Sequence, residues 1–268
     1  MSELHRQPVV MCFSGHDPSG GAGIVADIEA IKSMGCFAAP VITAHTVQDT
    51  RGVKRFECQS PELFYEQASI VLDDFSVAAF KIGMLGNTQI VAQVRRIIDA
   101  YPDCPVILDP VLAAGADDSA LAEDDMLDAL RNLLLPRTLF ITPNSIEARR
   151  LAPNADTLTA CAEALQDDGC EYVLITGTHE DSPEVINTLY ANHRVMEEFH
   201  WTRLPHAYHG SGCTLSAMIA ALLAHGLEPY SAIHEAQEYT WQTLEHGLSQ
   251  GKGQRIPHRL FWADDDAQ

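Results

Sequence analysis

The stretch His209-Gly210-Ser211-Gly212-Cys213-Thr214-Leu215 decides how the rest of this sequence is interpreted. Two glycines flank a serine, and small or apolar residues then follow as far as Leu223, which is typical of a buried helix. Gly226 ends the pattern, as a glycine just after a helix commonly does. A Gly-x-Gly turn into a helix points several unpaired backbone N–H groups at one place, and the helix dipole adds positive potential there. The stretch therefore predicts an anion site, most often a site for phosphate.

Cys213 lies in the first turn of this predicted helix. The positive potential should favour its thiolate, which makes it a candidate base. The alternative is a glycine-containing loop that caps a buried helix, with an inert cysteine in the core. Short glycine motifs have many false positives, so the stretch alone leaves both interpretations open.

Length and composition limit the kind of protein. The 268 residues are 46% hydrophobic, an ordinary value for a globular chain. No apolar run approaches the roughly 20 residues that span a bilayer, and the polar residues 1–8 do not resemble a signal peptide. A net charge of −20 argues against nucleic acid or an anionic membrane as a partner. We therefore expect a cytoplasmic protein that binds phosphate only where a local cradle offsets the global charge.

The chain has seven cysteines, an odd number, and no Cys-x-x-Cys pair. Several of them lie inside apolar runs. This pattern predicts mostly buried thiols in a reducing compartment, without a disulfide framework or a zinc site.

Short apolar runs alternate with helical patterns along the chain. The predicted strands cover residues 9–13, 37–43, 77–85, 106–108, 139–142 and 172–176, and a hairpin joins 186–190 to 197–202. The predicted helices cover residues 24–34, 61–72, 88–100, 119–134, 158–168 and 230–248. This alternation predicts an α/β domain in which helices cover a mostly parallel sheet. No repeat or linker is visible, so we expect one domain over residues 1–268, weakly specified from about residue 251.

Polar residues follow several predicted strands, at the edge where open α/β sheets bind ligands. A loop with four glycines and Asp17 follows the first strand, with Asp27 just beyond it, and Asp109 closes a later strand. The loop matches neither the Rossmann nor the P-loop pattern. The side-chain amide of Gln48 both donates and accepts, which suits a heterocyclic ring, although a solvated turn is the alternative. Met84 ends a third strand, where it lines a pocket or fills the core.

Six motifs occur in order along the chain. They are Gly15-His16-Asp17-Pro18-Ser19-Gly20-Gly21-Ala22-Gly23, Val47-Gln48-Asp49-Thr50-Arg51-Gly52-Val53, Lys81-Ile82-Gly83-Met84-Leu85, Asp109-Pro110-Val111, Thr142-Pro143-Asn144-Ser145-Ile146-Glu147-Ala148 and Gly210-Ser211-Gly212-Cys213-Thr214-Leu215-Ser216-Ala217. Together the motifs closely resemble those of the bacterial hydroxymethylpyrimidine/phosphomethylpyrimidine kinases of thiamine biosynthesis, within the ribokinase-like superfamily. The resemblance implies a ribokinase-like three-layer α/β/α fold with a central, mostly parallel sheet.

The resemblance also implies an activity. Such enzymes transfer the γ-phosphoryl group of ATP to 4-amino-5-hydroxymethyl-2-methylpyrimidine and then phosphorylate the monophosphate. ATP would be the co-substrate, Mg²⁺ the cofactor and a homodimer the assembly. Two alternatives remain, namely a pyridoxal kinase on the same scaffold and a pyrimidine-binding regulator that has lost catalysis.

Site residues follow from the resemblance. Those implied around the pyrimidine are Gln48, Gly15, Asp27 and Met84. Those implied in the anion hole are Gly210, Ser211, Gly212 and Cys213, with Cys213 standing where most relatives in the superfamily have an aspartate base. Those implied near the nucleotide phosphates are Asp109, Asn144, Thr176 and Gly177.

Asn144 and Glu147 match the superfamily's Asn-x-x-Glu, which organises Mg²⁺ and its waters. The same pair also fits a capping box, in which both side chains only cap a helix, and this alternative stays open. The sequence departs from its relatives at Ser211, where threonine is usual, and at Gln48-Asp49-Thr50, where many have Gln-Asn-Thr. Thr176 replaces a lysine that often contacts the ATP phosphates, so Mg²⁺ or another basic residue would have to neutralise that charge.

Overall fold

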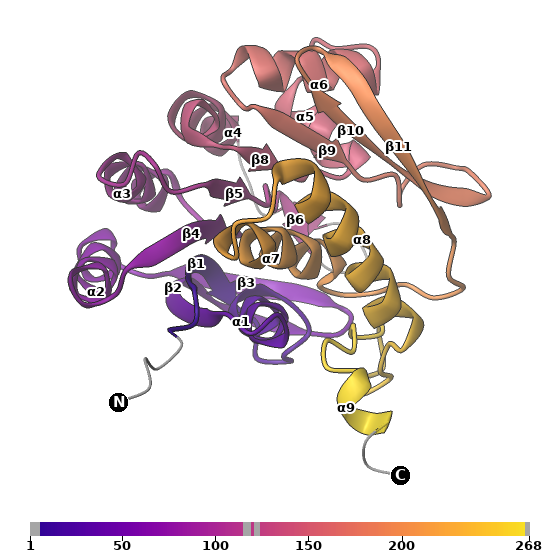
Figure 1. Cartoon of the computed structure of the whole chain (residues 1–268), viewed down its shortest axis with the longest axis horizontal. Helices are drawn as coiled ribbons and strands as arrows, with labels where there is room; N and C mark the ends of the chain where they lie inside the picture. Colours follow the sequence, from indigo (N-terminus) through magenta and orange to yellow (C-terminus); the bar gives the residue numbers. More distant parts are fainter. Residues whose placement is uncertain (1–5, 115–118, 121–123, 266–268) are drawn as a thin grey trace.

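Residues 6–114, 119–120 and 124–265 are described by the structure, which is a computed structural model. Within these residues a nine-stranded sheet has the order β11-β10-β9-β8-β5-β4-β1-β2-β3 (Figure 1). The strands are β1 (Val9–His16), β2 (Phe37–Asp49), β3 (Gly52–Cys58), β4 (Val77–Ile82), β5 (Val106–Leu108), β8 (Phe140–Ile141), β9 (Tyr172–Ile175), β10 (Glu184–Ala191) and β11 (Arg194–Thr202). A separate small ladder pairs β6 (Ala113–Ala114) with β7 (Ser119–Ala120).

Six neighbouring strands, from β9 to β2, run parallel, and only the flanking pairs β2–β3, β9–β10 and β10–β11 are antiparallel. The predicted mostly parallel sheet is therefore confirmed. The predicted hairpin is also confirmed, with its turn at Asn192 and His193, whose φ angles are 53° and 54°. Two consecutive left-handed residues give a turn whose twist matches that of the two strands.

Helices cover both faces of the sheet (Figure 1). One face packs against α1 (Gly23–Ser33), α7 (Ser211–Ala224) and α8 (Pro229–Glu245). The other packs against α2 (Pro61–Asp74), α3 (Thr88–Asp99), α4 (Asp124–Ala129), α5 (Ser145–Leu151) and α6 (Leu158–Asp167). Side chains alternate across each strand, so Met11 and Phe13 enter the second core while Val10 and Cys12 enter the first. This is the three-layer α/β/α fold that the sequence predicted.

Some predicted boundaries were wrong. The predicted helix over 119–134 begins instead with strand residues 119–120, and α4 continues into a π-helical turn at Leu130–Leu134; residues 121–123 lie outside the described residues. The second strand continues to Asp49, because its outer half pairs with β3 instead of forming a turn. As a result Gln48 lies on a strand.

The last part of the chain is better ordered than its composition predicted. Leu248 forms a bridge with Ile256, and Arg255 forms a bridge with Tyr208, just before the anion-hole stretch. A short helix, α9 (Trp262–Asp265), follows. Residues 253–259 therefore pack back against the β2–β3 hairpin tip and the start of α7.

Candidate active site

The anion-hole stretch lies at the carboxyl edge of the parallel strands. Gly210 precedes α7 with a φ of 88°, in the left-handed region that glycine adopts without a Cβ clash. The helix begins at Ser211, so the first backbone N–H groups have no carbonyl partner within it. Asp109, at the end of β5, lies opposite, since a Cβ on Gly212 would be 3.7 Å from its carboxylate. The predicted catalytic residues thus converge on the end of a central strand.

A buried charge cluster lies below the hole. Lys81 on β4 is fully buried, with its ammonium 2.8 Å from Asp27 and 3.8 Å from Asp109. Ser14 donates to Asp27 at 2.5 Å and accepts from Lys81 at 3.3 Å. Burial opposes the charge on Lys81, yet Asp27, Cys213 and Asp109 together raise its pKa. One buried cation therefore serves two buried carboxylates.

Cys213 does not have the stabilised thiolate that its place in the helix predicted. Burial, with smaller contributions from Asp109 and Asp27, raises the pKa of its thiol to about 12, although Lys81 lowers it. Burial and Asp27 also raise the pKa of Asp109, while Lys81 lowers it. The helix dipole is thus outweighed by desolvation and by two nearby carboxylates.

The glycine-rich loop is fastened to the anion hole. Asp17 accepts from the backbone of Ala22 at 2.9 Å and pairs with His209 at 3.0 Å. Burial alone would raise the pKa of Asp17, but hydrogen bonds from His209 and Ser19 outweigh it and lower the pKa. A Cβ on Gly21 would lie 2.6 Å from the His209 ring, so glycine is needed for this close approach. Asp17 therefore holds the glycine-rich loop against His209, just before the turn into α7.

The residues expected around the pyrimidine do not all lie together. Gly15 and Met84 adjoin, because a Cβ on Gly15 would be 3.1 Å from the methionine sulfur, and Thr43 donates to the Met84 carbonyl at 2.5 Å. Asp27 is engaged with Lys81 in the cluster below. Gln48 lies farther along β2, where its Oε1 is buried without a hydrogen-bond partner among the described residues. That unsatisfied acceptor is suited to a donor on a ligand.

The β8–β9 end carries the remaining predicted residues. Asn144 caps α5 by accepting from Ile146 and Glu147, each at 2.9 Å, and Glu147 accepts from the Asn144 backbone at 2.9 Å. The capping box is therefore real, and Glu147 also accepts from the backbone of Leu112 at 3.4 Å. Both residues therefore lie at the carboxyl end of β8.

Thr176 and Gly177 continue from β9. Thr176 bridges to Asn144 through its backbone, donating to Pro143 at 2.9 Å. The Gly177 N–H is already donated to Asn187 at 3.1 Å, and a Cβ on Gly177 would be 2.2 Å from the Ile186 carbonyl. Gly177 is thus needed for close packing against β10, and its N–H is not available to a phosphate in this arrangement.

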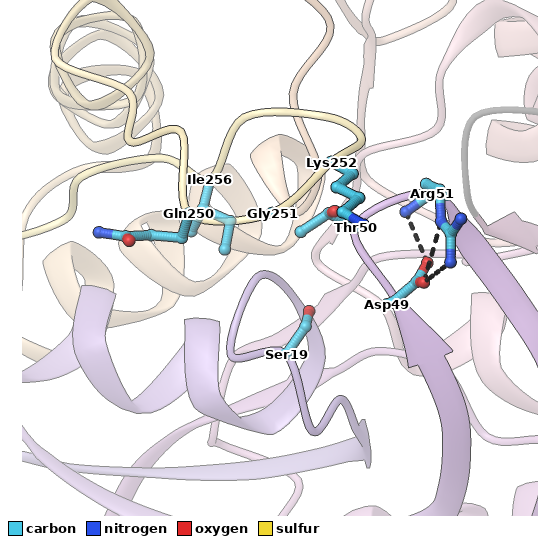
Figure 2. A pocket seen from close by; sticks show the side chains of 8 residues that line it. All are labelled: Ser19, Asp49, Thr50, Arg51, Gln250, Gly251, Lys252 and Ile256. Carbon is cyan, nitrogen blue, oxygen red and sulfur yellow. Dashed lines mark hydrogen bonds and ion pairs between the residues drawn. The ribbon is translucent and has the colours of Figure 1, made fainter.

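A cavity lies between the glycine-rich loop, the tip of the β2–β3 hairpin and residues 250–256 (Figure 2). Ser19 points towards it, and Arg51 folds back onto Asp49 at 2.6 Å. The hairpin tip is clamped at Thr50, which accepts from Gly253 at 3.0 Å through its hydroxyl. The C-terminal segment therefore closes one side of the site.

Two buried basic residues, Lys81 and Arg259, were assigned no role from the sequence alone. Lys81 had a signal, because a lysine inside the apolar run 77–85 must be paired when buried. Arg259 had none, since the segment around it lacks periodicity. Its side chain, 1% exposed, lies against the N-terminus of α7.

The side chains at this edge suit a Mg²⁺ ion that takes its remaining ligands from waters and substrate phosphates. Among the described residues no group of three or more His, Cys, Asp or Glu side chains could hold a metal ion. Mg²⁺ commonly uses one or two carboxylates together with waters and substrate phosphates. Asp109 is an anion facing an anion hole, so a phosphate bound there needs a cation between them. Asp109 and Glu147 are two carboxylates at this edge with the chemistry to hold the ion or its waters.

Other predictions concern the whole chain. All seven cysteines are free thiols, as expected. Within the described part of the chain, no helix is long and apolar enough to cross a membrane.

The chain resembles known kinases over almost its full length. The phosphomethylpyrimidine kinase family model matches residues 17–258. The hydroxymethylpyrimidine/phosphomethylpyrimidine kinases of Rhizobium meliloti and Escherichia coli are 33% and 35% identical, covering 96% and 93% of this chain and 99% and 94% of their own lengths. A Staphylococcus aureus pyridoxal kinase structure in complex with pyridoxal has a TM-score of 0.86 at 22% identity, covering 95% of this chain and 94% of its own. The phosphomethylpyrimidine kinase of Clostridium difficile has a TM-score of 0.74 at 29% identity, covering 88% and 98%.

The pyridoxal kinase likeness shows the ribokinase-like fold, and the family match goes further. The family match spans most of the glycine-rich loop, the β2–β3 hairpin, the anion-hole stretch and the C-terminal segment as far as residue 258. The chain belongs to the phosphomethylpyrimidine kinase family.

Proposed function

We propose that this protein is an ATP-dependent kinase that phosphorylates 4-amino-5-hydroxymethyl-2-methylpyrimidine and then its monophosphate, giving the diphosphate for thiamine biosynthesis. The observation that carries this proposal is the near full-length match to hydroxymethylpyrimidine/phosphomethylpyrimidine kinases at 33–35% identity. We further infer one cytoplasmic kinase domain that assembles as a homodimer.

In this proposal the anion hole receives the phosphoryl group in transit. Backbone N–H groups at the start of α7 meet the charge that develops on it, as phosphoryl transfer requires positioning and electrostatic stabilisation more than covalent chemistry. We assign Cys213 as the acceptor of the alcohol proton. Because the pKa of its thiol is raised to about 12, little thiolate is present at neutral pH, and the reaction must rely mainly on positioning.

Mg²⁺, when bound, would neutralise charge on the nucleotide phosphates. Asp109 would contact it or the phosphates, and Glu147 and Asn144 would hold its waters. A carboxylate offers about four acceptor positions, so the capping contacts of Glu147 do not by themselves exclude water binding. With Thr176 in place of a lysine, the metal would supply most of the neutralising charge near the nucleotide.

The pyrimidine would lie between the glycine-rich loop and the β2–β3 hairpin. Gly15 and Met84 offer it a small apolar surface, and the unsatisfied Gln48 oxygen would accept from the 4-amino group. Asp27 would act on the pyrimidine indirectly, through its contacts with Ser14 and Lys81.

Pyridoxal is the second candidate substrate. A Bacillus subtilis pyridoxal kinase in an ADP complex has a TM-score of 0.84 at 25% identity, covering 96% of this chain and 99% of its own. That identity is lower than the 33–35% shared with the pyrimidine kinases, which favours the pyrimidine.

An ATP-coupled assay with Mg²⁺ would test the function on three substrates: hydroxymethylpyrimidine, its monophosphate and pyridoxal. Phosphorylation of both pyrimidines is the expected result. Turnover of pyridoxal alone would replace the proposal with its alternative. Tight pyrimidine binding by calorimetry without any turnover would support a regulator and make Thr176 the central departure.

A further inference from the structure

Arg259 joins the C-terminal segment to the anion hole. Its guanidinium donates to the Gly21 carbonyl at 2.5 Å, to the Thr214 hydroxyl at 2.8 Å and to Glu29 at 2.9 Å. These partners belong to the glycine-rich loop, the first turn of α7 and α1. A single buried side chain thus holds three segments that are far apart in the sequence.

The contact with Thr214 reaches the peptide that begins the hole. Because Arg259 donates to the Thr214 oxygen, the Thr214 proton is directed to the Gly210 carbonyl, 2.8 Å away. The same carbonyl accepts from the Thr214 backbone at 3.0 Å. Two donors on the Gly210 carbonyl polarise its peptide, and the N–H of that peptide belongs to Ser211. Chained hydrogen bonds of this kind strengthen one another.

The contact with Gly21 fixes the opposite wall. A Cβ on Gly210 would be 2.0 Å from the Gly21 carbonyl and 2.9 Å from the Arg259 guanidinium, so the three groups converge. The far end of Arg259 is also anchored, as its carbonyl accepts from Tyr239 on α8 at 2.8 Å. The guanidinium therefore cannot move without disturbing the start of α7.

We propose that Arg259 is a positioning residue for phosphoryl transfer, which fixes the Gly210 peptide against the glycine-rich loop and places a permanent positive charge behind the anion hole. The inference rests on the proposed kinase function. Its charge is only partly offset, because Glu29, its carboxylate partner among the residues that the structure describes, has a side chain that is 41% exposed. A planar fork with separate donors suits this task better than the point charge of a lysine.

The experiment compares Arg259→Met, Arg259→Lys and the matched control Glu29→Gln. Arg259→Met should lower kcat by about 100-fold, comparable to the loss of one oxyanion donor, while pyrimidine affinity measured by calorimetry changes little. Arg259→Lys should recover only part of kcat, because it restores charge without the fork. Glu29→Gln should stay close to the parent in kcat, since it leaves the Gly21 and Thr214 contacts in place.

A second readout separates positioning from folding. Binding of ADP with aluminium fluoride and the pyrimidine mimics the transferring group, and Arg259→Met should weaken this complex far more than it weakens ADP alone. Equal weakening of both, or an unchanged kcat, would overturn the proposal. If Arg259→Met does not fold, Thr214→Val interrupts the same relay with Arg259 retained and should show the same selective loss.

The test also distinguishes this inference from the proposed function. If the parent enzyme does not phosphorylate the pyrimidine, calorimetry with inorganic phosphate reports on the hole directly. Weaker phosphate binding in Arg259→Met, with no change in Glu29→Gln, would uphold the inference while the kinase proposal fails. Equal phosphate binding in all three proteins would overturn the inference.

Discussion

At the α7 end of the active-site edge, buried ionised side chains from several segments lie together, whereas the β8–β9 end is held by backbone bridges, the Asn144 capping box and arginine side chains that are exposed or half-buried. Lys81, Asp27 and Asp109 are buried together at the first end, and Arg259 fixes the turn above them. The second end has the Asn144 capping box and no salt bridge between buried partners among the contacts described.

This difference shows where each end is vulnerable. Buried charges are costly when one partner is removed, because the remaining charge stays unsolvated. The β8–β9 end depends instead on steric fit and helix caps, whose individual contributions to the free energy of unfolding are smaller. Substitutions at the α7 end should therefore have larger effects than those at the β8–β9 end.

The largest effect is expected for Lys81→Met, because it leaves Asp27 and Asp109 buried without a cation. The free energy of unfolding should fall by about 3–5 kcal/mol, measured by chemical denaturation. Adding Asp27→Asn should restore part of the loss. The control Arg95→Met breaks the partly exposed pair with Asp99 and a hydrogen bond to the Leu133 carbonyl, and should cost less, about 1–2 kcal/mol. Equal losses in the two single variants would contradict the contrast between the ends.

Cys213→Ala should lower kcat by about 100-fold, at the low end for a general base, because the raised thiol pKa leaves little Cys213 thiolate to act as the base. Steady-state kinetics with saturating ATP would measure the change. Cys36→Ala, which removes a buried thiol elsewhere, is the matched control. Unchanged turnover in Cys213→Ala would remove the base assignment.

The pH dependence of kcat/KM tests the assignment of Cys213 as the base. With a thiol pKa of about 12, the thiolate fraction rises with pH throughout the stable range, so kcat/KM should increase about tenfold per pH unit from about pH 7.5 to about pH 9.5. Cys213→Ala should lose this slope. A plateau near neutral pH in the parent enzyme would mean that another group, or a thiol with a much lower pKa, accepts the proton.

Gly177→Ala tests the steric character of the β9 end. A Cβ would lie 2.2 Å from the Ile186 carbonyl, so overpacking should cost about 1–3 kcal/mol of stability. Thermal or chemical denaturation would measure it. Thr178→Ala, at the exposed neighbouring position, should change stability by less than about 0.5 kcal/mol. A tolerated Gly177→Ala would show that β10 can move.

The smallest effect on stability is expected for Glu147→Gln. It weakens the capping box by up to about 1 kcal/mol and should raise the Mg²⁺ concentration needed for half-maximal activity. Thr157→Ala removes the cap of α6 and should lower stability without changing the Mg²⁺ requirement. If Glu147→Gln likewise lowers stability without changing the Mg²⁺ requirement, Glu147 is only a cap.

The sequence was sufficient for what depends on local pattern. Runs such as 9–13 and 106–108 predicted buried parallel strands, and Asn192-His193 predicted the hairpin turn. The capping box was visible as Asn144 and Glu147 at the right spacing. Glycine positions predicted the turn into α7, because these requirements act between residues close in the chain.

Tertiary structure decided what depends on residues distant in the chain. Burial, with Asp109 and Asp27, raises the pKa of Cys213 against the lowering effect of Lys81, which reverses the direction that the sequence predicted. Arg259 contacts the first turn of α7 and the glycine-rich loop only because the C-terminal segment packs back against both. Burial and long-range charge pairing exist only in the folded chain, so the sequence alone could predict the turn into α7 but not the side chains that hold it.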